Sequence, residues 1–369
     1  MRRLMAALAA TALVALGPAA ATLAAAEGAD DGPTADEAVT AAERWLGRQQ
    51  QADGGFDGFL AGAGTPDTIL ALAESAQTES SWGNRPALER VESEVSADGH
   101  TPLDAARHIA RHVDDPQVTA RLITRVALPV GLEAGDDGPL GDLTGSASDW
   151  LEDDDTAFAA RVELAIALVA VGADLPEGLV DNVLAAQQAN GGWNADGDAD
   201  ADIVDLVTTG AVVDLLVLVG RDPSSGAIPA AMAFVGDTRD RTGAWPDPDG
   251  ERSAVATAGA IRADGHDPAG SCWLTEVGVD ADATAPVPAL IALQNDDGSF
   301  SGDNNPVRAT SDAVHALSGR WLPLGRASDA CAPESGGLPF APSLIVLVLI
   351  AVVGVGGGVR IMRGGQSAV

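Results

Sequence analysis

The chain has 369 residues, of which 46% are hydrophobic, so it can bury the core of one large domain or of two smaller ones. Its 21 basic and 54 acidic residues give a formal net charge of −33. A chain this acidic is repelled by phosphate backbones and anionic lipid, which argues against nucleic acid as a partner.

The N-terminal segment, residues 1–26, has the pattern of a secretory signal peptide. Arg2 and Arg3 precede an apolar run, and the small residues Ala24 and Ala26 suit a cleavage site. The sequence therefore predicts export, with a linker over residues 27–34 before the folded part.

A glycine corner follows the first predicted helix, residues 35–50, and recurs along the chain. "QQADGGF" (50–56) is matched by "QQANGGW" (187–193) and "QNDDGSF" (294–300), and "RDRTGAW" (239–245) is a worn copy. Aromatic positions 193, 245 and 300 are 52 and 55 residues apart. With weaker copies near 96–102 and 135–141, the pattern predicts six units of roughly 40–55 residues. The corner positions are Gln50, Asp53, Gly54, Gly55, Phe56, Gln187, Asn190, Gly191, Gly192, Trp193, Gly243, Trp245, Gln294, Asp297, Gly298 and Phe300.

Each corner lies between two predicted helices. The run before it includes residues 177–188 and 286–295, and the helix after it is rich in Ala and Val and opens on Asp, Ser or Thr. These three residue types accept hydrogen bonds from first-turn amides, so we expect them to be N-caps. No segment sustains an alternation of period two, so the sequence predicts an all-α fold with almost no sheet.

The Gln-x-x-Asp-Gly-Gly-aromatic units and their Ala-rich helices resemble the terpenoid cyclase / protein prenyltransferase α/α toroid superfamily, whose squalene–hopene cyclase branch carries such repeats. The resemblance covers residues 35–325. It implies two concentric rings of six helices around a central cavity. It also implies that each glutamine caps a neighbouring helix and that the aromatic ring packs beneath it. These motifs are structural, so they say little about chemistry.

The stretch "WLEDDDTAF", Trp150 to Phe158, holds the candidate catalytic residues. It resembles the Asp-x-Asp-Asp-Thr-Ala motif of class II terpene cyclases. The resemblance implies that Asp154 protonates a polyene, flanked by Glu152 and Asp155, with Trp150 and Phe158 at the ligand cavity. The first Asp of the motif is Glu here, and with 7 Trp, 6 Phe and 0 Tyr the chain offers few rings to stabilise a carbocation. The alternative is that this acidic run begins an inner helix and complements its dipole.

The stretch "NADGDADADIVD" is a candidate calcium loop. Asn194, Asp196, Asp198 and Asp205 stand at positions 1, 3, 5 and 12 of such a loop. Position 6 is Ala199 where the pattern requires glycine, so a solvated acidic loop is the alternative. No other cofactor is expected.

The two cysteines, Cys272 and Cys331, lie in the part of the chain that we expect to be exported. Thiols in an oxidising compartment are usually bridged, so the sequence predicts a disulfide between them. The alternative is two separate buried thiols.

The C-terminal region carries a predicted membrane anchor. Residues 338–359 contain no charge, and about 22 residues at about 1.5 Å each span about 33 Å, enough for a bilayer core. Arg360 and Arg363 follow and place the tail, residues 360–369, in the cytoplasm. Residues 326–337 form the linker to an extracellular toroid.

Together these features favour a cell-surface, membrane-anchored toroid that binds a small apolar ligand or a protein partner in its central cavity without catalysis. We expect that cavity to be lined mostly by Ala, Val and Leu. The alternative is a class II terpene cyclase-like enzyme that protonates a polyprenyl substrate through Asp154.

Overall fold

The computed structural model describes residues 33–58, 62–77, 82–135, 138–201, 205–222, 225–247, 250–264, 286–301, 305–318, 320–321 and 325–326. The chain divides into two units, Met1–Pro33 and Thr34–Val369, and the fold below is that of the second. The predicted signal peptide, both cysteines and the predicted membrane anchor lie outside the described residues. Within the described part, none of the helices combines the length and hydropathy needed to cross a bilayer.

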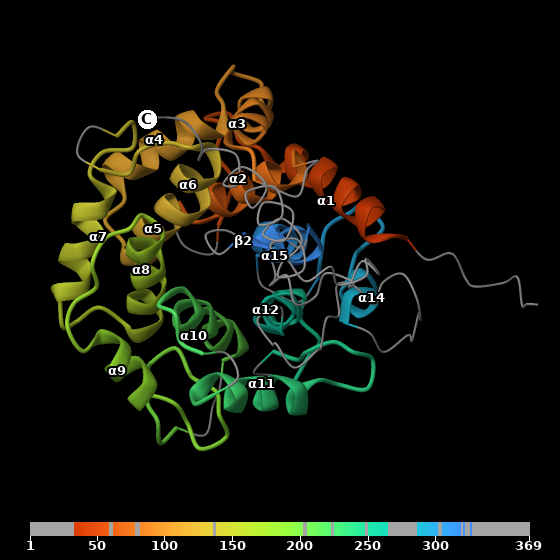
Figure 1. Cartoon of the computed structure of the whole chain (residues 1–369). Helices are drawn as coiled ribbons and strands as arrows, with labels where there is room; N and C mark the ends of the chain where they lie inside the picture. The colour runs from red at the N-terminus through yellow and green to blue at the C-terminus, as the bar shows by residue number, and fades with distance from the viewer. Residues whose placement is uncertain are drawn as a thin grey trace, which may run out of the picture. The chain divides into compact units, whose positions relative to one another are not determined.

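The inner helices of the second unit form a closed circuit (Figure 1). Each helix packs against the next one along the chain, and the last returns to pack against the first. In order they are α2 (Gly64–Ser75), α5 (Pro116–Arg121) with its continuation through the π-helical turn η1 (Leu122–Ala127) into α6 (Leu128–Val130), α8 (Phe158–Ala170), α10 (Leu206–Leu218), α12 (Ala254–Asp264) and α15 (Pro306–Ser318).

A second set of helices surrounds this circuit. The outer set is α1 (Ala35–Gln49), α3 (Asn84–Ser93), α4 (Pro102–His112), α7 (Leu143–Glu152), α9 (Leu179–Ala185), α11 (Ala227–Thr238) and α14 (Pro286–Ile291). For example, α1 packs against α15 and α2, α7 against α8, and α11 against α10 and α12. Among the described residues the only strands are β1 (Arg320–Trp321) and β2 (Gly325–Arg326), paired antiparallel. The fold is therefore a helical α/α toroid, while the number of repeats stays a prediction.

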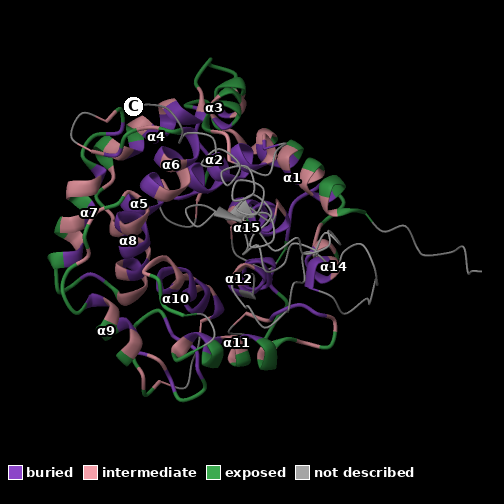
Figure 2. Cartoon of the chain, viewed as in Figure 1, coloured by how far each residue is buried: buried purple, intermediate pink, exposed green. Residues whose placement is uncertain are grey.

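The two sets differ in burial because their sequences differ in pattern. In α1 the buried residues are Ala38, Ala42, Trp45 and Leu46, which form one stripe of an amphipathic helix. In α2 every residue from Gly64 to Glu74 is buried, as expected for a helix covered on all sides. Figure 2 shows the same contrast, with the purple of buried residues concentrated on the inner helices.

One hydrogen bond recurs between each corner and the inner helix after it. The backbone N–H of the aromatic residue donates to a threonine hydroxyl at 3.0 Å in all four cases: Phe56 to Thr65, Trp193 to Thr209, Trp245 to Thr257 and Phe300 to Thr310. The expectation that such threonines are N-caps is therefore wrong for Thr65, which lies inside α2. It is correct for Asp205, which caps α10 by accepting from the Val207 N–H at 2.9 Å.

The glycine corners also dock on the outer helix that follows. Gly191 has φ +95°, and a Cβ there would lie 2.2 Å from the carbonyl oxygen of Ala230 on α11. A Cβ on Gly298 would lie 2.4 Å from the carbonyl oxygen of Ala41 on α1. Only glycine permits such an approach with this backbone conformation. The last corner thus docks on the first helix, which closes the ring.

The glutamines strengthen the same contacts. Gln187 Nε2 donates to the carbonyl of Ala227 at 2.9 Å, and Gln294 Nε2 donates to the carbonyl of Ala38 at 2.8 Å. Gln50 Nε2 instead donates within its own corner, to the carbonyl of Gly54 at 3.2 Å.

Candidate functional site

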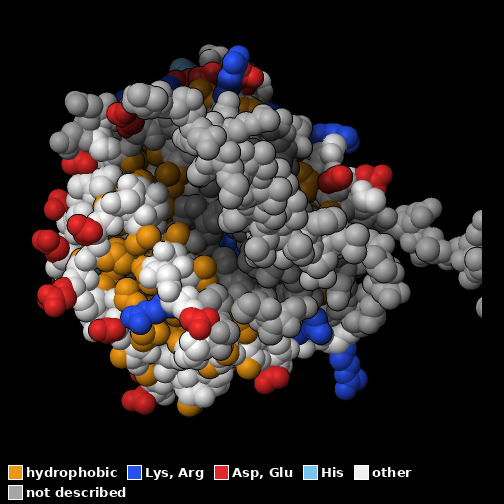
Figure 3. Space-filling view, viewed as in Figure 1, with side chains coloured by type: hydrophobic (Ala, Val, Ile, Leu, Met, Phe, Trp, Pro, Cys, Tyr) orange, Lys and Arg blue, Asp and Glu red, His pale blue; other side chains and the backbone are white. Residues whose placement is uncertain are grey.

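A cavity of about 70 Å³ lies between the inner helices. In the space-filling view the visible face is hollowed toward its centre, with acidic side chains scattered over the outer rim (Figure 3). All six parts of the inner circuit contribute to the cavity walls. The lining residues are Leu70, Thr124, Arg125, Glu163, Ile166, Val207, Ala211, Asp214, Arg262 and His315. The expected aliphatic side chains are present, but charged side chains share the walls with them.

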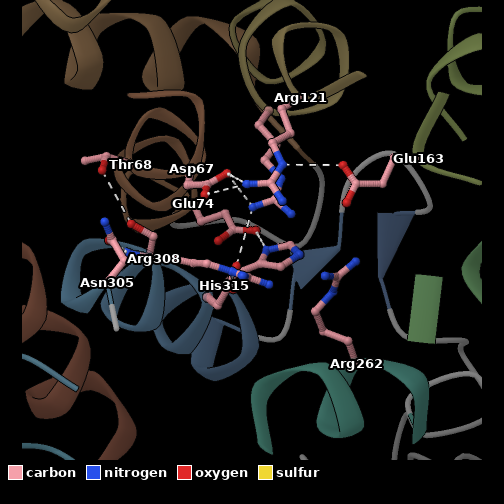
Figure 4. Close-up of polar contacts among 12 residues, drawn as sticks. Asp67, Thr68, Glu74, Arg121, Glu163, Arg262, Asn305, Arg308 and His315 are labelled. Carbon is pink, nitrogen blue, oxygen red and sulfur yellow. Dashed lines mark hydrogen bonds and ion pairs between the residues drawn. The ribbon is translucent and has the colours of Figure 1, made fainter. Parts of the chain in front are cut away.

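Asp67 on α2 is a deeply buried carboxylate of this centre, with a side chain only 1% exposed. Its Oδ2 lies 3.0 Å from Arg121 Nη1, and its Oδ1 lies 2.7 Å from Arg125 Nη1. Arg121 also reaches Glu163 of α8, with 3.4 Å between Nε and Oε2 (Figure 4). Two arginines therefore neutralise one buried carboxylate and connect α2 to α8.

The two arginines face the centre because of a local change in helix geometry. They are four residues apart, so they project from one side of the helix that runs through η1. Pro129 lies four residues after Arg125 and cannot donate to its carbonyl, so a regular α-helical turn is disfavoured there. The π-helical turn accommodates the proline, and such turns occur frequently at functional sites.

Further ion pairs connect α15 to η1 and α12 to α10. Asp312 on α15 lies 3.4 Å from Arg125 Nη1 and 3.6 Å from Arg308 Nε. Across the cavity, Arg262 Nη2 lies 2.7 Å from Asp214 Oδ2. Each of these carboxylates thus has at least one arginine partner.

The most deeply buried pair joins the first and last inner helices. His315 Nδ1 on α15 contacts Glu74 Oε1 on α2, and the two side chains are 4% and 0% exposed. Beside this pair, Thr68 and Ser311 share a hydroxyl–hydroxyl hydrogen bond of 3.4 Å (Figure 4). The contact between α2 and α15 is therefore polar as well as apolar.

Burial and neighbouring charges fix the protonation of these groups. Burial lowers the pKa of His315 well below its ordinary value, and the nearby Arg262 and Arg125 lower it further, so the imidazole is neutral. For Asp312 burial raises the pKa, but Arg125, Arg308, Arg121 and Arg262 outweigh it and hold the pKa below its ordinary value. This centre therefore combines the ionised carboxylate of Asp312 and guanidinium groups with a neutral histidine.

The repeat register contains a signal for these residues. Two positions after the threonine that bonds the corner stand Asp67 and Asp312, and five positions after it stand Asp214, Arg262 and His315. Positions two and five differ by three, so they share one helix face. Aligning the repeats on that threonine identifies the residues of each inner helix that face the cavity. Aligning them on the corner glycines does not, because the spacing from the corner to the threonine varies.

The proposed proton donor lies elsewhere. The side chain of Asp154 is fully exposed, 3.8 Å from Arg161 Nη2, in the loop before α8. Glu152 and Asp155 are exposed too. The alternative that this run begins the helix is wrong, because α8 begins at Phe158. Arg161 instead holds the loop, donating to the carbonyls of Asp153 and Thr156 at 2.7 and 2.9 Å.

Trp150 and Phe158, the two predicted cavity residues, are partly buried against the main hydrophobic core and do not line the central cavity. Phe158 packs under the next acidic loop, where a Cβ on Gly197 would lie 2.6 Å from its ring.

The candidate calcium loop is internally hydrogen-bonded. Asn194 is buried, donates to the carbonyl of Asp198 at 3.0 Å and accepts from the Asp198 N–H at 3.0 Å. Asp205 caps α10, while Asp196 and Asp198 are exposed. Among the described residues no group of three or more His, Cys, Asp or Glu is arranged to hold a metal.

Comparison with solved structures shows what this toroid is similar to. The type II terpene cyclase MstE from Scytonema, without ligand, matches with a TM-score of 0.53 and 15% identity over 77% of this chain and 97% of that one. MstE variants bound to the substrate geranylgeranyl dihydroxybenzoate and to the product merosterolic acid A match with a TM-score of 0.52 and 15% identity, each over 77% of this chain and 96% of theirs. No family model and no curated protein matches the chain. The fold is therefore terpenoid cyclase-like, and at this identity the likeness shows the fold alone.

Proposed function

We propose that this toroid is a binding module that receives a small polar ligand at its centre. The observation that carries the proposal is the lining of the cavity, where Arg125, Glu163, Asp214, Arg262 and His315 share the walls with aliphatic side chains. Pockets combine apolar walls with a few placed polar groups that fix the ligand. On the strength of this lining we propose a polar ligand in place of the small apolar one expected from inner helices rich in Ala, Val and Leu.

The protonation of the centre supports binding over proton-initiated cyclisation. An acid that protonates an alkene must hold its proton in a shielded site. Asp67 and Asp312 are instead paired with arginines, and burial with nearby arginines keeps His315 neutral by lowering its pKa. Among the described residues that line the cavity there is no Phe, Trp or Tyr to stabilise a carbocation.

Filling the cavity tests this proposal. Ala211→Leu adds side-chain volume at the cavity wall, and Ala97→Leu adds the same volume at an exposed loop. Thermal denaturation of the full chain with a panel of small polar and apolar molecules should identify a polar compound that raises Tm. Ala211→Leu should abolish that rise and Ala97→Leu should retain it. A panel without effect, or a rise that survives in Ala211→Leu, would refute the proposal.

A second candidate function is a terpene cyclase-like enzyme, and the likeness to MstE favours it over a non-catalytic role. The toroid fold of MstE receives geranylgeranyl dihydroxybenzoate, so that compound and shorter polyprenyl chains are the first substrates to assay. In this hypothesis Asp154 donates the proton. Turnover that disappears in Asp154→Asn but persists in Asp200→Asn, an exposed aspartate elsewhere, would establish it. No product from any polyprenyl substrate would remove it.

The location is proposed from the sequence alone. The apolar run before Ala26 and the uncharged residues 338–359 followed by Arg360 support an exported toroid on a single membrane anchor. Protease added to intact cells should then remove the toroid and leave a membrane-bound C-terminal fragment. A full-length chain in the soluble cell fraction would contradict this location.

Two smaller proposals concern Cys272–Cys331 and Ca²⁺. A disulfide predicts no mass change on alkylation of the denatured chain without reductant and two added labels after reduction. Calcium at the loop from Asn194 predicts binding heat and a higher Tm on titration with Ca²⁺. Two added labels without reductant would contradict the disulfide. A titration with Ca²⁺ that releases no heat would contradict the calcium site.

A further inference from the structure

Charges of both signs face each other across the central cavity. Glu163 lies on α8, and within the described part of the chain its Oε2 has one partner, Arg121 Nε, at the long distance of 3.4 Å. Arg262 lies on α12, on another wall of the same cavity. The charged lining residues are two arginines and two carboxylates, so the walls favour neither a net positive nor a net negative ligand.

Some hydrogen-bonding capacity of this lining is unused within the described residues. Arg262 donates through Nη2 to Asp214, while its buried Nε has no hydrogen-bond partner. A buried donor without a partner is unfavourable, and a ligand acceptor would relieve that penalty. His315 bonds Glu74 through Nδ1, so its second ring nitrogen is the one left for a ligand.

We propose that the cavity selects a small zwitterion, with its carboxylate at Arg262 and its ammonium group at Glu163. The inference rests on the proposed binding function and names the ligand class. A simple anion would leave its charge opposite Glu163 and Asp214, and a simple cation would face Arg125 and Arg262. A zwitterion pairs both ends, so each charge that leaves water gains a partner.

The size of the cavity limits the ligand further. About 70 Å³ holds a group of a few heavy atoms and is far below the roughly 300–1,000 Å³ of pockets for drug-sized ligands. Glycine, the smallest amino-acid zwitterion, is therefore the probe of choice. Acetate and methylammonium carry its two charges separately and serve as matched comparisons.

Calorimetric titration of the full chain with these three compounds tests the inference. Glycine should bind at least about tenfold more tightly than acetate or methylammonium, because each charged hydrogen bond contributes about that factor or more. Acetate binding as tightly as glycine would show a plain anion site, and equal binding of methylammonium a plain cation site. Either result, or no binding of glycine, would overturn the proposal.

Two variants assign the contacts. Glu163→Gln keeps the side-chain size and should weaken glycine about tenfold without weakening acetate, because the substitution removes a carboxylate that repels an anion. Arg262→Met should weaken both, whereas Arg252→Met removes an arginine paired with one aspartate, Asp240, outside the cavity and should change neither. Glycine affinity that survives Glu163→Gln would refute the assignment even if Arg262→Met fails to fold. If another compound binds and Ala211→Leu blocks it while glycine does not bind, the proposed function stands and this inference fails.

Discussion

The corners of the ring and its centre differ in how far along the chain their partners lie. Each corner aromatic bonds a threonine 9 to 16 positions later. At the centre, Arg121 reaches 54 positions back to Asp67, Arg125 reaches 187 positions forward to Asp312, and Glu74 reaches 241 positions forward to His315. The bond between each corner aromatic and its threonine therefore follows from local sequence, while the ion pairs of the centre join helices that are far apart in the chain.

This difference separates two kinds of stabilisation. The corners repeat one structural motif of Gln, Gly and an aromatic residue, so their contribution to stability is divided among several copies. The central cluster occurs once, and its charges depend on one another, because removing one partner leaves the others buried and uncompensated. Removing a charge from the central cluster should thus lower the free energy of unfolding more than a substitution at a corner does. Four predictions, from the largest expected effect to the smallest, follow from this comparison.

The largest effect is expected for Asp67→Asn, which leaves Arg121 buried, 5% exposed, without its closest carboxylate. Breaking a buried ion pair from one side costs about 3–5 kcal/mol. The control is Glu89→Gln, because the pair of Glu89 with Arg85 is exposed. Chemical denaturation of the two variants measures the loss in free energy of unfolding. The control should lose at most about 1 kcal/mol. Equal losses in the two variants would mean that the central cluster adds no more than a surface pair.

At a corner, Gly191→Ala should cost about 3 kcal/mol, because the residue has φ +95° and the new Cβ meets the Ala230 carbonyl oxygen. Gly220 also has positive φ, but no atom lies within 4 Å of its built Cβ. Gly220→Ala should therefore cost only the conformational part, about 1–2 kcal/mol. The difference in the free energy of unfolding isolates the docking of the corner on α11. Identical values would show that this close approach yields easily.

The threonine that bonds each corner should contribute less to stability than the corner glycine does. Thr209→Val keeps the shape but leaves the buried Trp193 N–H without its acceptor, which costs about 1–3 kcal/mol. Thr238 bonds only carbonyls of its own helix, so Thr238→Val should change little. Denaturant unfolding of the two variants gives the comparison, and a Thr209→Val loss no larger than that of the control would contradict it.

The smallest effect is a pH dependence. His315, which faces Glu74, Arg262 and Arg125, has a pKa lowered by burial and by the two arginines, so the unfolded chain takes up a proton that the folded chain refuses. Stability should therefore be retained above about pH 6.5 and fall below it, by up to about 1.4 kcal/mol per pH unit. His315→Asn should flatten the profile between pH 6.5 and 5. A profile of wild-type slope in that variant would assign the dependence to other groups.

The residues that the sequence located correctly are those with local partners. Gln187, Gly191 and Trp193 form a corner as the repeat indicated, and α1 lies close to its predicted range. The role of Thr65 was missed because an N-cap and a corner acceptor need the same side chain at almost the same place.

The central residues were missed for a different reason. Arg121 and Arg125 lie on a helix whose preceding corner is too degenerate to fix a register, and the π-helical turn shifts the register again. A local motif indicated Asp154 as the candidate proton donor of the alternative function, and Arg161 holds its loop at the surface. Which charges meet across a ring depends on helix rotation, and hydrophobic periodicity does not define that rotation for α10 and α12, because both are buried on nearly all sides.

The docking of the last corner on the first helix also governs how the molecule unfolds. Trp45 Nε1 donates to Asp297 at 3.1 Å and Arg48 donates to the Asp297 carbonyl at 2.7 Å, beside the contact of Gly298 with Ala41. Open arrays of repeats fray from their ends, because a terminal unit has a single neighbour. Here the first and last units are each other's neighbours, so no unit can peel away alone, and melting should proceed as one cooperative transition.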